Sequence, residues 1–193
     1  RKHAAEMGKA VPEEPMLFMK PPSAVVGPGD EIVLPKQSRV VHHEGELAAV
    51  IGTRLRNVDR TEARAGILGW TCLNDVSARD LQKKDVQYTR AKGFDTFCPI
   101  GPCIARGPGI DPERLSVRTF VNGEPRQDGS TDDLIWSAAE VVRFVASVMT
   151  LRPGDVVSTG TPSGVGPLAG GDVVRVEIPG IGALENPVVS EAV

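Results

Sequence analysis

Short apolar runs, each bounded by turn-forming residues, recur along most of the chain. Clusters of Gly, Pro and Asp flank these runs, and this pattern favours short β-strands. Asn122-Gly123 separates two of the runs and is typical of a tight hairpin turn. The predicted strands comprise residues 17–19, 31–34, 41–52, 67–74, 115–121, 125–127, 156–159, 172–178 and 182–189.

Helical patterns are fewer and shorter. Ser137 and Glu140 have the spacing of a capping box, which predicts the start of a helix. The residues that would form its apolar face are Val141, Val142, Val145, Val148 and Met149. Residues 84–97 are polar and predict a loop. Other helical segments are predicted at residues 3–10, 59–66 and 77–83.

One stretch combines a strand pattern with charge. Glu44 and Glu46 flank Gly45 and precede the apolar run 47–51. Because side chains alternate along an extended segment, the two carboxylates point to the same side. Two neighbouring carboxylates repel each other unless a proton or a cation lies between them. A hard divalent cation would remove the conflict, whereas two solvated charges at an exposed strand end are the alternative.

A third carboxylate follows another predicted strand. Asp75 lies where residues 67–74 pass into the next predicted helix, so it could cap that helix. It could equally be the third ligand of an ion bound by Glu44 and Glu46. Three carboxylates plus water form an open site of the kind that binds Mg²⁺ or Mn²⁺. His42 shares the face of the glutamates, and its participation would favour a softer metal.

Composition limits the class of protein. The 193 residues suffice for one well-packed domain, and the 21 Gly and 16 Pro favour a turn-rich, β-rich fold. A net charge of −3 with interspersed signs argues against a nucleic-acid partner, and no apolar run has membrane-spanning length. Three cysteines without metal-binding spacing predict reduced thiols in a cytoplasmic protein. Because the chain opens on Arg1 rather than Met, we expect that an earlier segment is absent.

Other positions also offer chemistry. His3 and Glu6 lie one helical turn apart, the spacing of a general base oriented by a carboxylate, although such a pair on a polar terminal helix is usually solvated. Lys92 stands in the predicted polar loop and could bind a substrate carboxylate or an enolate oxygen. Residues 160–166 resemble a backbone nest for an anion. They lack the Gly-Lys-Ser/Thr ending of a nucleotide-binding loop.

Six motifs occur together in an order that one enzyme family shares. They are His-Ala-Ala-Glu at 3–6, Lys-Pro-Pro-Ser at 20–23, His-His-Glu-Gly-Glu-Leu at 42–47, Asn-Asp-Val-Ser-Ala-Arg-Asp-Leu-Gln at 74–82, Lys-Gly-Phe-Asp at 92–95 and Thr-Gly-Thr-Pro-Ser-Gly-Val-Gly at 159–166. With these motifs the chain resembles the fumarylacetoacetate hydrolase family, in particular its small single-domain acylpyruvase and oxaloacetate decarboxylase-like members.

The resemblance implies a fold, a metal and roles for individual residues. The implied fold is α+β and predominantly β, a roll of mixed sheets with a few short helices. It would form a single catalytic domain over residues 1–193, with a lid in residues 1–15, and it would assemble as a homodimer. Mg²⁺ or Mn²⁺ would be bound by Glu44, Glu46 and Asp75. The other implied site residues are the catalytic dyad His3 and Glu6, Lys92 at the substrate oxyanion, and the substrate-binding residues Arg79, Gln82, Thr161 and Lys20.

The implied substrate is a small 2-oxo or 2,4-dioxo acid that chelates the metal, which would stabilise an enolate. Our first prediction is a C–C bond hydrolase or decarboxylase of the acylpyruvate or oxaloacetate type. An isomerase of 2-hydroxyhepta-2,4-diene-1,7-dioate in aromatic catabolism would use the same enolate and is the alternative. A member that binds metal without turnover is a further alternative, but a binding protein would need no base such as His3 with Glu6.

Overall fold

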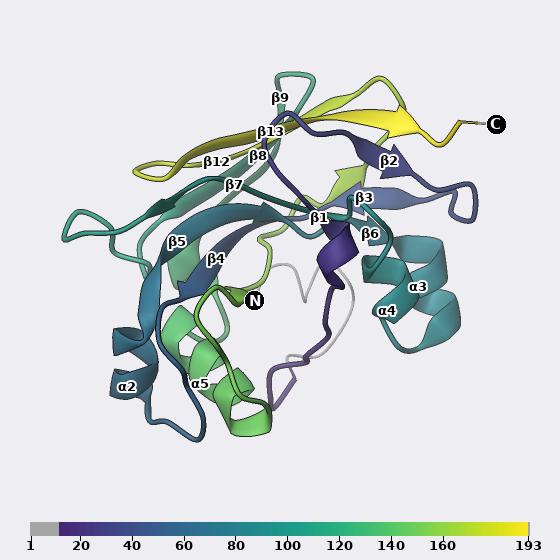
Figure 1. Ribbon diagram of the computed structural model, residues 1–193. Coiled ribbons are helices and arrows are strands. Elements are labelled where there is room, and N and C mark those ends of the chain that lie inside the picture. Colours follow the sequence, from purple (N-terminus) through teal and green to yellow (C-terminus); the bar gives the residue numbers. More distant parts are fainter. Residues whose placement is uncertain (1–11, 193) are drawn as a thin grey trace.

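Strands make up most of the regular structure in the computed structural model, which describes residues 12–192 (Figure 1). The strands are β1 (Val25–Val26), β2 (Ile32–Leu34), β3 (Val41–His43), β4 (Gly45–Ile51), β5 (Ile67–Asn74), β6 (Ser77–Ala78), β7 (Cys98–Ala105), β8 (Ser116–Val121), β9 (Glu124–Ser130), β10 (Val156–Ser158), β11 (Gly166–Pro167), β12 (Val173–Ile178) and β13 (Gly182–Ser190). The α-helices are α2 (Arg60–Ala65), α3 (Arg79–Asp85), α4 (Thr89–Lys92) and α5 (Ala138–Val148), and the 3-10 helices are η1 (Pro22–Ala24) and η2 (Thr131–Asp133).

The strands form three sheets. Two have five strands, in the orders β1-β7-β5-β4-β10 and β2-β13-β12-β8-β9, and the third has the order β11-β3-β6. β1 pairs with β7 in parallel, and so does β2 with β13, whereas pairs such as β4 with β5 are antiparallel. The prediction of mixed sheets with few helices is therefore confirmed.

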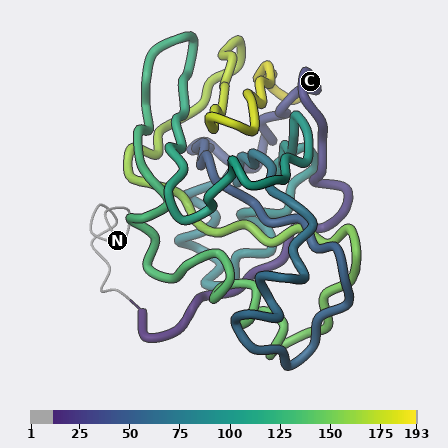
Figure 2. Tube along the Cα trace, turned by 90° about the vertical axis from the view of Figure 1, so that its left-hand side faces the viewer, coloured from purple at the N-terminus to yellow at the C-terminus, as the bar shows by residue number. Residues whose placement is uncertain are grey.

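The core lies where the two five-stranded sheets face each other and where α5 covers the first of them (Figure 1). All seven residues of β4 are buried. Their side chains alternate, so that Leu47, Ala49 and Ile51 enter this core while Glu46 and Ala48 lie on the opposite face. The first described residues and the C-terminal strands lie at opposite ends of the molecule (Figure 2). No helix of the described part of the chain could cross a membrane.

The capping box predicted for α5 is present. The Ser137 hydroxyl accepts from the Glu140 amide, and the Glu140 carboxylate accepts from the Ser137 amide at 2.8 Å. Val141, Val142 and Val145 are buried as predicted. Val148 is 54% exposed, contrary to the prediction, because it is the last helical residue and the chain leaves the helix at Met149 in an extended conformation.

Other local predictions were wrong or incomplete. Residues 17–19 form no strand within 12–192, because no other described strand pairs with them, and they line a cavity instead. The predicted loop 84–97 contains α4. β7 was not predicted, since Pro and Gly interrupt its apolar pattern. The predicted helix 3–10, with His3 and Glu6, lies outside the described residues.

Gly45 has no room for a side chain, because a β-carbon there would lie 2.2 Å from the Thr119 hydroxyl and 3.2 Å from Val176. We expect Gly45→Ala to push the two large sheets apart and to lower the free energy of unfolding by about 1–3 kcal/mol. Chemical denaturation measures this change. Gly109→Ala is the matched control, since nothing lies within 4 Å of a β-carbon at that position. Equal stability of the two variants would contradict the packing argument.

Candidate metal centre and substrate cavity

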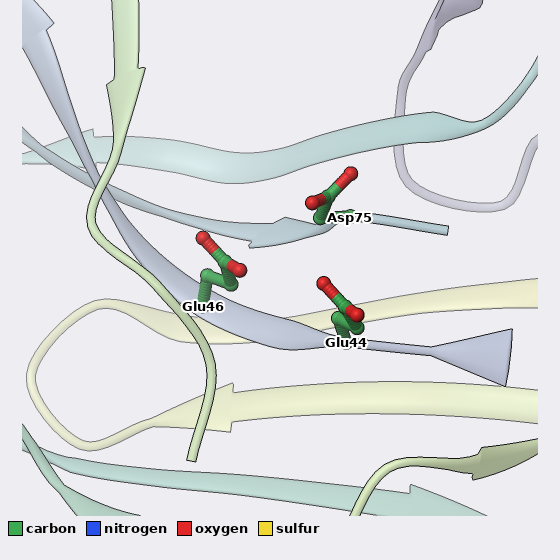
Figure 3. A group of neighbouring side chains, drawn as sticks. All are labelled: Glu44, Glu46 and Asp75. Carbon is green, nitrogen blue, oxygen red and sulfur yellow. The ribbon is translucent and has the colours of Figure 1, made fainter. Parts of the chain in front are cut away.

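Strand register brings three carboxylates together. In the antiparallel pair β4–β5, Gly45 lies opposite Asn74, and the Asp75 amide donates to the Glu44 carbonyl oxygen at 2.8 Å. Glu46 follows two residues after Glu44 and points to the same face. One oxygen from each of the three carboxylates lies within 4.8 Å of the others, and all three side chains are buried. Figure 3 shows the carboxylates of Glu44, Glu46 and Asp75 around a common space.

Two of these carboxylates are neutralised by cationic side chains. Lys92 Nζ donates to Glu44 Oε2 at 2.8 Å and to Asp75 Oδ2 at 2.5 Å. Lys20 Nζ lies 2.5 Å from the other oxygen of Asp75, and the Arg79 guanidinium forms an ion pair with Glu44. α4 carries Lys92, α3 begins at Arg79, and Lys20 precedes η1. The cations therefore converge on the carboxylates from three separate segments.

Glu46 has different surroundings. Its Oε2 accepts from the Ser158 hydroxyl and, at 2.9 Å, from the Gly160 amide, and it makes no ion pair within residues 12–192. Burial, together with the charges of Asp75 and Glu44, raises the pKa of Glu46 to about 8. This side chain is consequently the position of the site at which an additional positive charge would be most stabilising.

Unlike Glu46, the neighbouring groups have pKa values that favour their charged forms. Burial disfavours the charged form of Asp75, but Lys20 and Lys92 outweigh this effect and lower its pKa to about 2. Burial also opposes the charge on Lys92, yet the carboxylates of Asp75 and Glu44 raise its pKa above the ordinary value. Lys92 therefore stays protonated at neutral pH and cannot serve as a base there.

The donor set fits a hard divalent cation. Three carboxylates with a common open space are ligands of the type that Mg²⁺ and Mn²⁺ take. Among the described residues they form the one convergent group of three or more His, Cys, Asp or Glu side chains, and His42 does not belong to it. Asp75 does not cap α3, because the N-cap residue is Ala78. The role of the three carboxylates as metal ligands stays a prediction.

A cavity of about 950 Å³ opens beside the carboxylates. Its polar end contains the predicted substrate-binding residues Arg79, Gln82, Lys20 and Thr161, together with Lys92. The Arg79 guanidinium donates to Gln82 Oε1 at 3.0 Å, so these two side chains form one unit. The rest of the lining is largely apolar and includes Trp136, Val145 and Met149, with some polar residues such as Asp133 and Asp155.

Thr161 lies at the edge of this cavity, but its hydroxyl proton is already used. The hydroxyl donates to the Gly45 carbonyl oxygen at 2.9 Å and accepts from the Gln127 amide at 2.8 Å. A substrate carboxylate would have to compete with Gly45 for this proton.

Several neighbours of the site were assigned no functional role from the sequence. Ser158 stands directly before the Thr-Gly-Thr motif and could have been inferred from that position. Phe18, whose ring centroid lies 4.9 Å from Lys92 Nζ, was predicted only as part of a strand. Gln127 and His43 are fully buried beside the site. Sequence alone gave no reason to place Gln127 there, since it follows a hairpin turn with an ordinary polar pattern.

Comparison with known proteins places the chain among related enzymes. The family described as "Fumarylacetoacetate (FAA) hydrolase C-terminal" matches residues 1–189. The oxaloacetate tautomerase YisK of Bacillus subtilis is 42% identical over 97% of this chain and 66% of its own length.

Solved structures agree with this assignment. A 5-carboxymethyl-2-hydroxymuconate delta-isomerase from Mycobacterium smegmatis is 50% identical, with a TM-score of 0.92 over 100% of this chain and 76% of that chain. The fumarylpyruvate hydrolase of Pseudomonas aeruginosa, solved in complex with Mn²⁺ and pyruvate, is 36% identical, with a TM-score of 0.92 over 98% of this chain and 85% of that chain. Since the family match covers almost the whole chain and the fold agrees, the protein belongs to the fumarylacetoacetate hydrolase family.

Proposed function

We propose that this protein is a divalent-metal-dependent enzyme that acts on a small 2-oxo or 2,4-dioxo acid through an enolate. The observation that carries the proposal is the state of Glu46. One oxygen of its buried carboxylate lies within 4.8 Å of an oxygen from each of two further carboxylates, so Glu46 must either hold a proton, as its raised pKa of about 8 indicates, or share a cation with them. The fumarylpyruvate hydrolase of P. aeruginosa, which has the same fold, was solved with Mn²⁺ and pyruvate, and this supports Mn²⁺ or Mg²⁺ as the cation.

The residues around the cavity suit such a substrate. When bound, the divalent cation supplies positive charge at the oxygen on which the enolate develops. Lys92 remains charged and lies beside the metal-ligand candidates, so its ammonium group would stabilise the same oxygen. Arg79 and Gln82 act as one unit and would bind a substrate carboxylate.

The reaction that we place first is isomerisation, in which a proton is transferred between the enol oxygen and a carbon of the substrate. Two named relatives, at 50% and 42% identity, are an isomerase and a tautomerase. In such a step the enol oxygen loses a proton and C3 gains one, and His3 with Glu6 remains the predicted pair that moves them. C–C bond hydrolysis, favoured by the 36% identical fumarylpyruvate hydrolase, is the second candidate. It would use the same pair to deprotonate water.

A substrate panel distinguishes the candidates. We expect Mn²⁺ or Mg²⁺ to accelerate the conversion of enol to keto oxaloacetate, followed by ultraviolet absorbance, and a chelator to abolish the acceleration. Fumarylpyruvate and acetylpyruvate, with products identified by mass, report hydrolysis, and release of CO₂ from oxaloacetate reports decarboxylation. Absence of every metal-dependent activity would favour the non-catalytic alternative.

The predicted dyad of His3 and Glu6 has its own test. We expect His3→Ala to lower turnover by about 10²–10⁴-fold, the usual contribution of a positioned general base, while Mn²⁺ affinity stays unchanged. Steady-state kinetics and calorimetry measure the two quantities. Full turnover of the His3→Ala variant would rule out the dyad.

A homodimer remains part of the proposal, and light scattering coupled to size-exclusion chromatography tests it.

A further inference from the structure

A buried amide side chain links the candidate metal-binding strand to the loop that follows β10. Gln127 lies in β9 and is 1% exposed. Its Oε1 accepts from the Gly45 amide at 2.9 Å, and its Nε2 donates to the Thr161 hydroxyl at 2.8 Å and to the Pro162 carbonyl oxygen at 2.9 Å. Each hydrogen of the amide group and its oxygen are therefore engaged.

The orientation of this amide is fixed by its partners. A backbone N–H can only donate, so the oxygen must face Gly45, and a carbonyl can only accept, so the nitrogen must face Pro162. The His43 ring contributes to the same end, since its Nδ1 lies 3.3 Å from Gln127 Oε1.

The loop packs tightly against β9, which Gln127 occupies. A β-carbon at Gly164 would lie 2.2 Å from the Arg126 carbonyl oxygen, and one at Gly129 would lie 2.4 Å from Pro162. The same loop provides the Gly160 amide that donates to Glu46 Oε2 at 2.9 Å. Movement of the loop away from β9 would therefore change the orientation of Glu46 and displace Thr161 together.

We propose that Gln127 is a positioning residue, which holds the loop 159–165 against β4 so that Glu46 and Thr161 keep the orientation required for metal and substrate. This inference rests on the proposed function. Gln127 would contact neither substrate nor metal. It would act through its hydrogen bonds with the Gly45 amide and the Thr161 hydroxyl.

The test compares variants that break one end of this link. Gln127→Glu keeps an acceptor for Gly45 and His43, but it places an oxygen against the Pro162 carbonyl oxygen. We expect calorimetry to show Mn²⁺ affinity lowered by about 10- to 100-fold, as for other changes behind a metal ligand. Asn186→Asp is the matched control, because Asn186 is also 1% exposed and its amide holds a loop, at the Gly27 and Asp30 carbonyl oxygens, away from the cavity. It should lower the melting temperature and leave Mn²⁺ affinity unchanged.

Thr161→Val breaks the link from the loop side and serves if Gln127→Glu fails to fold. We expect a similar loss of Mn²⁺ affinity, and in the Gln127→Glu, Thr161→Val double variant a loss no larger than that of either single variant. Wild-type protein that binds Mn²⁺ together with a Gln127→Glu variant of equal affinity would overturn this inference and leave the proposed function standing. Additive losses of Mn²⁺ affinity in the double variant would also overturn this inference and leave the proposed function standing. A wild-type protein that binds no Mn²⁺ would overturn both.

Discussion

Replacing Glu46 with Gln is expected to stabilise the metal-free protein above neutral pH and to abolish metal binding and turnover. The amide has nearly the shape of the carboxylate and can still accept from the Gly160 amide, but it carries no charge. Burial and the charges of Asp75 and Glu44 raise the pKa of Glu46, so a neutral side chain at this position avoids both the desolvation cost and the repulsion. The charge of Glu46 is what a divalent cation needs. Calorimetry with Mn²⁺ and thermal unfolding measure the two effects on one variant.

The expected stabilisation by Glu46→Gln follows from the pH dependence of the stability of the metal-free protein. The pKa of Glu46 is raised on folding, from 4.5 to about 8, so the folded state holds the proton more tightly than the unfolded state. Stability of the metal-free wild type should therefore fall as pH rises between about 4.5 and 8, by about 1.4 kcal/mol per pH unit from this group. Asp75 acts in the opposite direction, because its lowered pKa gives stability that is lost only as pH falls from 3.8 toward 2.

Glu185→Gln is the control for this experiment, since Glu185 is exposed on β13. It should leave the pH profile and Mn²⁺ affinity unchanged. We expect the profile of Glu46→Gln to be flatter than that of the wild type between pH 5 and 8, and saturating Mn²⁺ to flatten the wild-type profile as well. A Glu46→Gln variant that is less stable than the metal-free wild type at pH 8 would contradict the electrostatic account.

Replacing Lys92 with Met should have the opposite effect on metal affinity. The Lys92 ammonium occupies Glu44 Oε2 and Asp75 Oδ2, oxygens that a cation would take, so its removal frees ligands and increases their mutual repulsion. We expect tighter Mn²⁺ binding. Turnover should nevertheless fall by about 10²–10³-fold, because a charge that stabilises the developing oxyanion is lost.

The metal-free Lys92→Met protein should also be less stable. Removing one partner of a buried ion pair leaves uncompensated charge, which typically costs about 3–5 kcal/mol, and Mn²⁺ should restore most of this loss. Arg60→Met is the control, since its ion pair with Glu113 is exposed and should contribute about 1 kcal/mol or less. Weaker Mn²⁺ binding in Lys92→Met, or unchanged turnover, would show that Lys92 does not compete with the cation or assist the substrate.

The sequence predicted those parts of the fold that depend on local patterns. The hairpin at Asn122-Gly123, the capping box at Ser137 and the strand over 67–74 are all present, because turn chemistry, capping and apolar runs are local signals. The strand predicted at residues 17–19 is absent, and β7 was not predicted. In both places long-range strand pairing, rather than the local sequence pattern, decides the conformation.

In the candidate site, too, local features could be predicted from the sequence and long-range contacts could not. Alternation along a strand was enough to place Glu44 and Glu46 on one face, and the position of Asp75 after a strand agreed with it. The pairing of the cations with individual carboxylates could not be predicted, because it depends on where α3 and α4 pack. Gln127 was missed for a similar reason, since its partners are about 35 and 80 residues away in the chain.

Crystals grown with Mn²⁺ and measured at the manganese absorption edge would locate the ion directly. We expect one anomalous peak among Glu44, Glu46 and Asp75, with at least one oxygen of each carboxylate at bonding distance, and no such peak in Glu46→Gln crystals. A manganese peak elsewhere, with Glu44 and Asp75 still paired to Lys20, Lys92 and Arg79, would contradict the assignment of these carboxylates as metal ligands. An undiminished peak in the Glu46→Gln crystals would contradict it as well.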